Sequence, residues 1–283
     1  MTSSLFRYRR IAVPLRWKLL TASQYTRDVA LLTVVTLLIA VTEFIFAYQN
    51  VAYGIIVALF LALGLAALSA LAPVSPAMSR ALDSLNLLPL YILLTSSLPW
   101  FLLDQQLLLP AVYYCIIVLC LRHLHSQGRN ITSPEALGLR RRHALRFLLL
   151  GAVIGVPTGT MEYAILLPAP ELPFLDLKQV ARDILYMVVF VGFTEELLFR
   201  GVLQNDIAEV LGWKGGLFFS SLLFGIMHMT WRSVPELGFT FGAGLLLGYF
   251  YWRSRSLVGP IALHAVNNVV LVSIMPYVIR AGA

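Results

Sequence analysis

Long apolar runs follow one another along almost the whole of this chain, with only short polar segments between them. Candidate runs lie at residues 29–48, 51–72, 86–103, 107–121, 144–168, 179–203, 215–230, 237–252 and 257–279. A helix needs about 20 predominantly apolar residues to cross a hydrocarbon core about 30 Å thick. The sequence therefore predicts an all-α fold, a polytopic transmembrane helical bundle of about eight or nine spans.

The composition argues against most water-soluble classes. Hydrophobic residues make up 59% of the 283 residues and charged residues 12%, whereas soluble domains have roughly 45–50% apolar and about 25% charged residues. A disordered tail, a coiled coil and a typical cytosolic enzyme are therefore excluded. The first run is not followed by a clear small-residue cleavage site, so we expect a signal anchor rather than a cleaved signal peptide.

The basic residues gather in two clusters beside apolar runs. The first cluster comprises Arg7, Arg9, Arg10, Arg16, Lys18 and Arg27, and the second comprises Arg122, Arg129, Arg140, Arg141, Arg142 and Arg146. With nine spans and a cytoplasmic N-terminus, sixteen basic residues fall on the cytoplasmic side and four on the other, with Arg200 inside the membrane. The positive-inside rule favours that orientation.

Neither basic cluster is interleaved with aromatic residues, so we expect no nucleic-acid partner. The expected location is an integral, multi-pass position in a membrane. The absence of retention signals and long loops favours a prokaryotic plasma membrane. The sequence does not indicate an oligomeric state.

One polar stretch divides the chain into four expected regions. They are a basic cytoplasmic N-terminal segment (1–27), a four-span N-terminal membrane region (28–121), a basic cytoplasmic loop (122–145) and a C-terminal membrane region (146–283). Nearly all polar groups of interest fall in the last region. Its eighth run also carries Gly238, Gly242, Gly244 and Gly248, whose small-xxx-small spacing predicts close helix packing.

Charged side chains inside apolar runs are costly unless they are paired or face a wet cavity. The sixth run contains Glu195, Glu196 and Arg200. Glu196 and Arg200 are four residues apart and share a helix face, which permits a charge-assisted hydrogen bond. Glu195 lies about 100° further round the helix and has no partner on its own segment. Glu43 and Glu162 also lie in or near apolar runs, and no partner is evident for either.

Two further runs carry polar groups. His228 ends the seventh run, while His264 and Asn268 lie four residues apart near the start of the ninth and share one face. At roughly 1.5 Å per residue, Glu195, His228 and His264 lie on the order of 10 to 20 Å from their predicted cytoplasmic helix ends. One shared cavity in the middle or cytoplasmic half of the membrane is therefore feasible.

These residue types suit the activation of water. A desolvated carboxylate acts as a base, a histidine positions the water, and an imidazole with a carboxamide can stabilise an oxyanion. Two other classes of function stay open: a membrane transporter that uses the same residues as a proton relay, and a catalytically silent scaffold of the same fold. An isolated intramembrane histidine, or an isolated Glu–Arg pair, is also often only structural.

The polar residues resemble the pattern of a known family. The CPBP family of intramembrane peptidases, named for CAAX proteases and bacteriocin-processing enzymes and also called the ABI family, carries Glu-Glu-x-x-x-Arg, Phe-x-x-x-His and His-x-x-x-Asn on successive transmembrane helices. These motifs stand here at residues 195–200, 224–228 and 264–268. The resemblance covers residues 180–275, and it implies that residues 146–283 form a catalytic membrane region around that core.

The resemblance implies a role for each matching residue. Glu195 would be the general base that activates water, and His228 would help to hold that water. His264 and Asn268 would form the oxyanion site, and the neighbouring glutamate–arginine pair would brace these groups. The implied activity is that of a CAAX prenyl protease-like intramembrane endopeptidase. From the estimated depth of these residues we expect it to cut near the cytoplasmic side of the membrane.

The family has been described both as metal-dependent and as glutamate-dependent without metal. No His-Glu-x-x-His pattern occurs in the sequence, and Glu195, His228 and His264 would be the ligands of a single divalent metal ion if one is present. A metal-free site is favoured. The implied partners are the lipid bilayer and a membrane-anchored protein or peptide, with a CAAX-type tail, a leader peptide and a C-terminal sorting signal as the candidate substrates.

Overall fold

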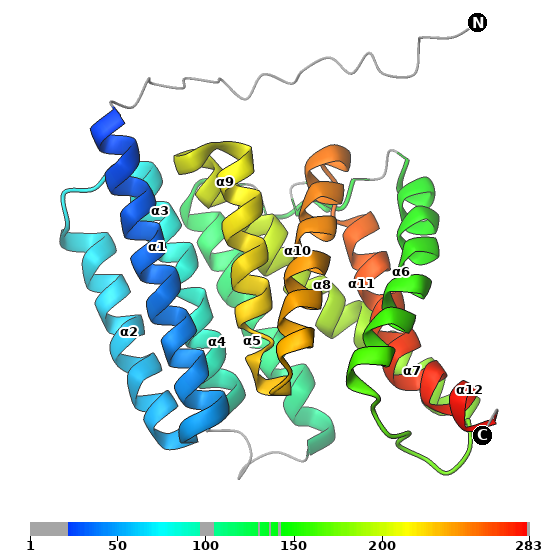
Figure 1. Cartoon of the computed structure of the whole chain (residues 1–283). Helices are drawn as coiled ribbons and strands as arrows, with labels where there is room; N and C mark the ends of the chain where they lie inside the picture. The colour runs from blue at the N-terminus through cyan, green and yellow to red at the C-terminus, as the bar shows by residue number, and fades with distance from the viewer. Residues whose placement is uncertain (1–21, 97–104, 130, 136, 141–142, 282–283) are drawn as a thin grey trace, which may run out of the picture.

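The computed structural model of this chain describes residues 22–96, 105–129, 131–135, 137–140 and 143–281 (Figure 1). The basic segment expected at residues 1–27 lies mostly outside the described residues, as do residues 97–104, which include the end of the third expected span. Every regular element within the described residues is a helix, which confirms the expected all-α fold.

Most helices follow the expected apolar runs, but one short helix, α3 (Pro76–Leu85), lies between the second and third of them. Those of the front half are α1 (Ala22–Phe44), α2 (Val51–Leu71), α3 (Pro76–Leu85), α4 (Leu87–Ser96) and α5 (Gln105–Ser126). Those of the back half are α6 (Ala144–Leu166), α7 (Leu177–Tyr186), α8 (Phe193–Glu196), α9 (Gln204–Ile226), α10 (Val234–Ser254), α11 (Val258–Val269) and α12 (Met275–Ala281). Short π-helical stretches continue them: η1 (Ile45–Gln49), η3 (Met187–Gly192), η4 (Leu197–Leu203) and η6 (Val270–Ile274). A 3-10 turn, η5 (Met229–Trp231), follows α9.

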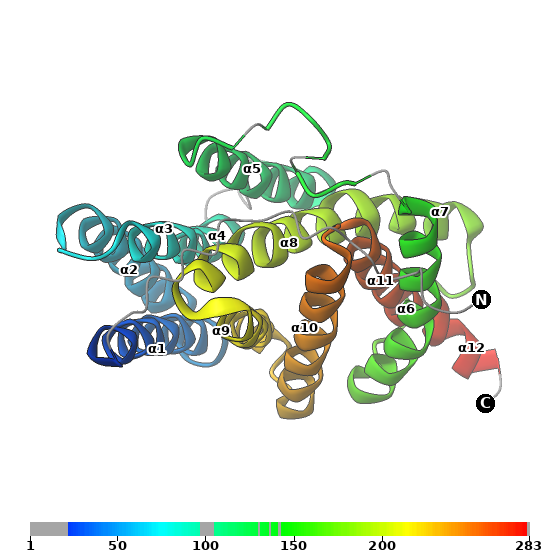
Figure 2. The ribbon, with the colours of Figure 1, turned by 90° about the horizontal axis from the view of Figure 1, so that it is seen from above.

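Helix α8 lies in the middle of the bundle. Figure 1 shows α1 to α4 on one side of the molecule and α6, α7, α11 and α12 on the other. Seen from above, α8 lies between α5 and the pair formed by α9 and α10 (Figure 2). Leu85 of α3, Leu88 of α4 and Phe199 of η4 are buried in one hydrophobic core. The segment that carries the two adjacent glutamates is therefore enclosed by both halves of the chain.

The two ends of the bundle differ in charge. One end, at the top of Figure 1, holds the start of α1, the end of α5, the start of α6 and the end of α10. We call it the basic end, because its helix ends and connections carry Arg27, Arg80, Arg122, Arg129, Arg140, Arg146, Lys214, Arg253 and Arg255. The opposite end holds the α6–α7 and α9–α10 connections and the end of α12, with Lys178, Arg182, Arg232 and Arg280.

Five helical stretches within the described residues are long and apolar enough to cross a membrane. They are Ala22–Gln49, Val51–Leu71, Ala144–Leu166, Leu177–Trp231 and Val258–Ile279. The expected count of eight or nine spans is not confirmed. One reason is that Leu177–Trp231 is a single stretch of 55 residues, which contains two of the expected spans and bends at Gly212, where φ is 80°. Another is that α10 is not among these stretches, since Glu236 and Arg253 lower its mean hydropathy.

The exposed side chains of the outer helices suit a lipid environment. Leu37 of α1 is 58% exposed, Phe60 of α2 is 69% exposed and Val153 of α6 is 69% exposed. Apolar side chains of this size are usually buried in water-soluble proteins, whereas acyl chains solvate them in a bilayer. With the five spanning stretches, these faces identify an integral membrane protein.

Helices α6 and α11 approach each other closely. An added Cβ at Gly151, Gly155 or Gly159 would lie closer than 3.0 Å to a backbone carbonyl oxygen of α11. The glycines expected to pack closely in α10 do so only in part. Gly244 and Gly248 lie against Ser221 and Gln204, respectively, but Gly238 and Gly242 have nothing within 4 Å of an added Cβ. The three α6 glycines recur every four residues, so they form one stripe along α11.

We expect Gly155→Ala to destabilise the bundle. The new methyl group would meet the carbonyl oxygen of Leu263, and overpacking of this kind costs about 1–3 kcal/mol. Gly242→Ala is the matched control, because its methyl group has room and alanine favours helix by up to about 1 kcal/mol. Thermal unfolding of the purified protein in detergent measures both. Equal melting temperatures for the two variants would contradict the close packing of α6 on α11.

Candidate active site

The two adjacent glutamates lie on a short α-helical segment between two π-helical stretches. Helix α8 follows η3 and precedes η4, and π-helical turns are frequent at functional sites. Every residue from 194 to 204 is buried. Polar side chains on this segment must therefore find partners inside the protein, because a buried polar group without a hydrogen bond is costly.

Glu196 and Arg200 form a buried ion pair. Arg200 Nη1 donates to Glu196 Oε1 at 2.7 Å, as the four-residue spacing permits, and both side chains are fully buried. Arg200 Nη2 donates to the carbonyl oxygen of Gly244 on α10 at 3.3 Å. The guanidinium carbon also lies 4.4 Å from the centre of the Phe224 ring on α9, within the range of a cation–π interaction. Arg200 therefore joins η4 to α9 and α10.

His264 of α11 lies between the two glutamates. Its Nδ1 is 2.8 Å from Glu196 Oε1, and its Nε2 is 3.8 Å from Glu195 Oε2. An ionised carboxylate only accepts hydrogen bonds, so Nδ1 carries a proton. The longer distance exceeds that of a hydrogen bond, so Nε2 faces Glu195 without being bonded to it. One arginine cannot neutralise two carboxylates, and His264 is the neighbouring side chain that can carry a second positive charge.

Two tyrosines that the sequence did not identify hold Glu195. Tyr113 of α5 donates to Glu195 Oε1 at 3.1 Å, and Tyr91 of α4 lies 3.4 Å from the same oxygen and donates to it. Glu195 Oε2 has no hydrogen bond within the described part of the chain. A tyrosine in an apolar run is also a common interfacial anchor, so its sequence context gives no signal for this role. The front half thus supplies part of the surroundings of Glu195.

A cavity of about 170 Å³ lies beside Glu195. It is lined by Tyr91, Tyr113, Glu195, Phe199, Met227, His228, Thr230 and Trp231. His228 Nδ1 lies 2.7 Å from the carbonyl oxygen of Phe224. Because a carbonyl oxygen only accepts, Nδ1 carries the proton, and Nε2 of the neutral ring is an acceptor. The cavity therefore brings together the Glu195 carboxylate and the His228 imidazole, whereas His264, the third residue expected to share it, is not among its lining residues.

Asn268 lies beside a second polar cluster instead. It is partly buried on α11, and its Oδ1 accepts a hydrogen bond from Asn267 Nδ2 at 3.3 Å. Asn267 Nδ2 also donates to Glu162 Oε2 on α6, so Asn267 is the partner of Glu162 that the sequence left unidentified. Within the described residues, Asn268 neither lines the cavity beside Glu195 nor bonds to the other predicted site residues. Its link to them is its position four residues after His264.

The predicted residues do not gather into a metal site. No three His, Cys, Asp or Glu side chains in the described ranges are grouped closely enough to hold a metal ion. Glu195, His228 and His264 were the ligand set considered from the sequence. In the structure His264 Nδ1 is engaged by Glu196, and His228 Nδ1 is engaged by a backbone carbonyl. Such Nδ1 hydrogen bonds leave Nε2 free and are typical of metal-binding histidines, but within the described residues these three side chains are not grouped closely enough to hold a metal ion.

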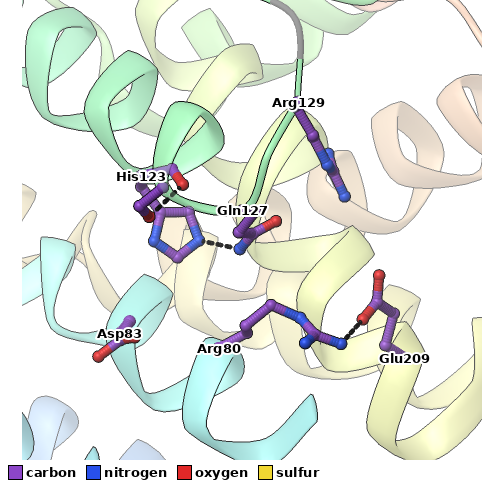
Figure 3. Close-up of a pocket in the computed structure, with 7 residues that line it drawn as sticks. Arg80, Asp83, His123, Gln127, Arg129 and Glu209 are labelled. Carbon is purple, nitrogen blue, oxygen red and sulfur yellow. Dashed lines mark hydrogen bonds and ion pairs between the residues drawn. The ribbon is translucent and has the colours of Figure 1, made fainter. Parts of the chain in front are cut away.

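A larger cavity, of about 690 Å³, lies at the basic end (Figure 3). It is lined by Arg80, Asp83, His123, Ser126, Gln127, Arg129 and Glu209. Arg80 of α3 pairs with Glu209 of α9 at 2.5 Å (Figure 3), and His123 of α5 lies 2.6 Å from Asp206 of α9. These contacts connect the front half to α9. The lining contains none of the six predicted site residues.

We expect Arg200→Met to destabilise the protein strongly. It leaves Glu196 buried without its cation, and breaking a buried ion pair in this way costs about 3–5 kcal/mol. The double variant Glu196→Gln/Arg200→Met should recover part of the loss, because no unpaired charge remains. Arg80→Met is the control, since the more exposed Arg80–Glu209 pair is worth at most about 1 kcal/mol. Thermal unfolding in detergent measures all three, and equal losses for Arg200→Met and Arg80→Met would refute this account.

Comparisons with known proteins match the region that carries these motifs. Residues 178–270 match the family described as type II CAAX prenyl endopeptidase Rce1-like. The uncharacterized protein YpbD of Bacillus subtilis (strain 168) is 33% identical over 94 residues, which are 33% of this chain and 46% of that protein. The chain thus spans about half the length of that relative. No solved structure matches the chain significantly.

All six predicted site residues fall inside the matched region. The match also confirms the resemblance to the CPBP family that the three motifs indicate. Residues 178–270 of this integral membrane protein therefore resemble the type II CAAX prenyl endopeptidase Rce1-like family.

Proposed function

We propose that the chain is an intramembrane endopeptidase, a hydrolase that cuts a peptide bond of a membrane-associated protein or peptide. The observation that carries this proposal is the setting of Glu195. Its carboxylate is buried, one oxygen is held by two tyrosines, and the other has no hydrogen bond within the described residues. The residue borders a cavity that also contains His228. The match to a CAAX protease family supports the assignment.

In the proposed reaction Glu195 acts as the general base. A water molecule in the cavity donates one hydrogen bond to the Glu195 carboxylate and the other to His228 Nε2, which is the acceptor nitrogen of that ring. Transfer of a proton to Glu195 leaves a hydroxide, whose oxygen attacks the carbonyl carbon of the scissile bond. The carbonyl π electrons move to the carbonyl oxygen, which becomes an oxyanion.

His264 is proposed to stabilise the oxyanion, whereas Asn268, the second group expected there, lies beside Asn267 and Glu162 instead. His264 Nε2 already faces Glu195, and Glu196 fixes the ring through Nδ1. Collapse of the tetrahedral species breaks the C–N bond, and Glu195 returns its proton to the departing nitrogen. The products are a carboxylic acid and an amine. The Glu196–Arg200 pair touches neither the water nor the substrate in this scheme, so its role is to position His264.

We expect Glu195→Gln to lower the rate of peptide cleavage by about 100-fold or more. The amide keeps the shape of the side chain but cannot take a proton from water, and a general base contributes about 10²–10⁴-fold. Glu43→Gln is the matched control, because Glu43 is a buried glutamate of α1 that does not line the cavity. Cleavage of fluorogenic peptides by the purified protein measures both variants. A wild-type rate for Glu195→Gln would overturn the proposed function.

We expect Tyr113→Phe to lower kcat about 10-fold while the protein still folds. The change removes one hydrogen bond to the Glu195 carboxylate. A hydrogen bond to a charged group is worth about 1.5–3 kcal/mol, and about 1.4 kcal/mol corresponds to a factor of ten in rate. Tyr114→Phe is the control, since Tyr114 is the next residue and is 64% exposed. The same fluorogenic assay, run at saturating peptide, compares them. Equal kcat values for the two variants would show that Tyr113 does not position Glu195.

A further inference from the structure

The cavity beside Glu195 has its mouth at the end of the bundle opposite the basic end. Met227, His228, Thr230 and Trp231 line it from the α9–α10 connection, and that connection lies at the lower end of the bundle in Figure 1. Thr230 is exposed, and Trp231 is 48% exposed. The mouth therefore reaches the surface at this connection.

A hydrogen bond fixes the connection to the far end of α1. Arg232 Nε donates to the carbonyl oxygen of Ala47 at 2.8 Å. Ala47 lies in η1, which continues the C-terminal end of α1, whereas Arg27 lies near the start of α1 at the basic end. Since α1 with η1 covers 28 residues, a rise of about 1.5 Å per residue places the two ends roughly 40 Å apart. The mouth and the basic end thus lie near opposite membrane surfaces.

Buried apolar side chains of η4 separate Glu195 from the basic end and leave no open path between them in the described part of the chain. Phe199 is 1% exposed, and Val202 and Leu203 are 0% exposed. They belong to the hydrophobic core that also contains residues of α3, α4 and α5. The polar cavity of Figure 3 lies beyond this layer and shares no lining residue with the cavity beside Glu195. Water and a peptide therefore reach Glu195 by way of the mouth.

The charges set the orientation of the bundle. Nine basic residues lie at the basic end and four at the opposite end within the helices and connections that the structure describes. Trp213 and Trp252 stack at 4.4 Å near the basic end, beside Lys214 and Arg253, as is typical of a membrane interface. The positive-inside rule makes the basic end cytoplasmic. The mouth then opens on the other side of the membrane.

We propose that this site takes its substrate from the non-cytoplasmic side, as a peptide segment at the membrane surface of an exported or membrane-inserted protein. The inference rests on the proposed endopeptidase function. It differs from the expectation of cleavage near the cytoplasmic side, which came from counting residues between Glu195 and the predicted end of its helix. That count measures depth along one helix, whereas the residues that line the mouth decide from which side the cavity is entered.

Labelling of single cysteines tests the side of the mouth without any substrate. The two natural cysteines, Cys115 and Cys120, are free and are replaced by alanine to give a background that does not react. Thr230→Cys reports on the mouth, Ala169→Cys on the same end in the α6–α7 connection, and Arg253→Cys on the basic end. All three positions are exposed.

Intact cells that express each variant are treated with a membrane-impermeant maleimide, before and after permeabilisation. We expect Thr230→Cys and Ala169→Cys to be labelled in intact cells and Arg253→Cys only after permeabilisation. The reverse pattern would overturn the inference. Labelling of Thr230→Cys only after permeabilisation or denaturation would also overturn the inference. If Thr230→Cys does not accumulate, the labelling of Ala169→Cys decides the test instead.

Reconstituted vesicles separate this inference from the proposed function. Proteoliposomes whose orientation is scored by Ala169→Cys labelling receive the fluorogenic peptides from outside. Cleavage only where the mouth faces outward supports the inference, and cleavage only in the reverse orientation overturns it. If the wild-type protein cleaves nothing, in vesicles or in detergent, the proposed function fails, while the labelling pattern still decides which side the mouth faces.

Discussion

The buried ion pair between Glu196 and Arg200 determines how the helices at the centre of the bundle are positioned. Removing two charges from solvent is costly, and attraction between them offsets that cost only if the remaining donors and acceptors are also satisfied. Here the backbone of α10, the Phe224 ring of α9 and His264 of α11 supply additional contacts. Glu196 Oε2 and Arg200 Nε have no hydrogen-bond partner among the described residues. One pair on one helix thereby fixes the positions of three others.

That arrangement also orients the candidate reaction centre. Glu196 holds His264 by Nδ1, so the other ring nitrogen faces Glu195. Glu195 itself is held from the opposite direction, by tyrosines of α4 and α5. The Glu195 carboxylate therefore lies between His264, which Glu196 holds, and two tyrosine hydroxyls that donate to it. Preorganised polar groups of this kind do not have to reorganise during a reaction.

The sequence predicted what depends on local spacing. Except for α3, the helices follow the apolar runs, and the pairing of Glu196 with Arg200 follows from their separation of four residues. The placement of His228 beside Glu195 was also expected, because both motifs belong to one recognisable set. The span count was less reliable, since the sharp bend at Gly212 lies inside a continuous helical stretch.

Contacts between distant segments could not be predicted in the same way. Tyr91 and Tyr113 precede Glu195 by 104 and 82 residues, respectively, and they resemble any other tyrosine of a membrane helix. The glycines of α6 were not identified either, because only the facing backbone of α11 shows how close the two helices come. Small residues in α10 suggested close packing, and half of them have open space instead.

The walls of the cavity come from both halves of the chain, yet the family match begins only at residue 178. A polypeptide limited to residues 178–270 would retain the motifs but would lack two sides of the chamber around Glu195. Proteins that share these motifs and differ in their front helices would keep the same reactive groups within different walls. Selection for a new substrate could then act on α4 and α5, far in sequence from every motif residue, and leave the chemistry unchanged.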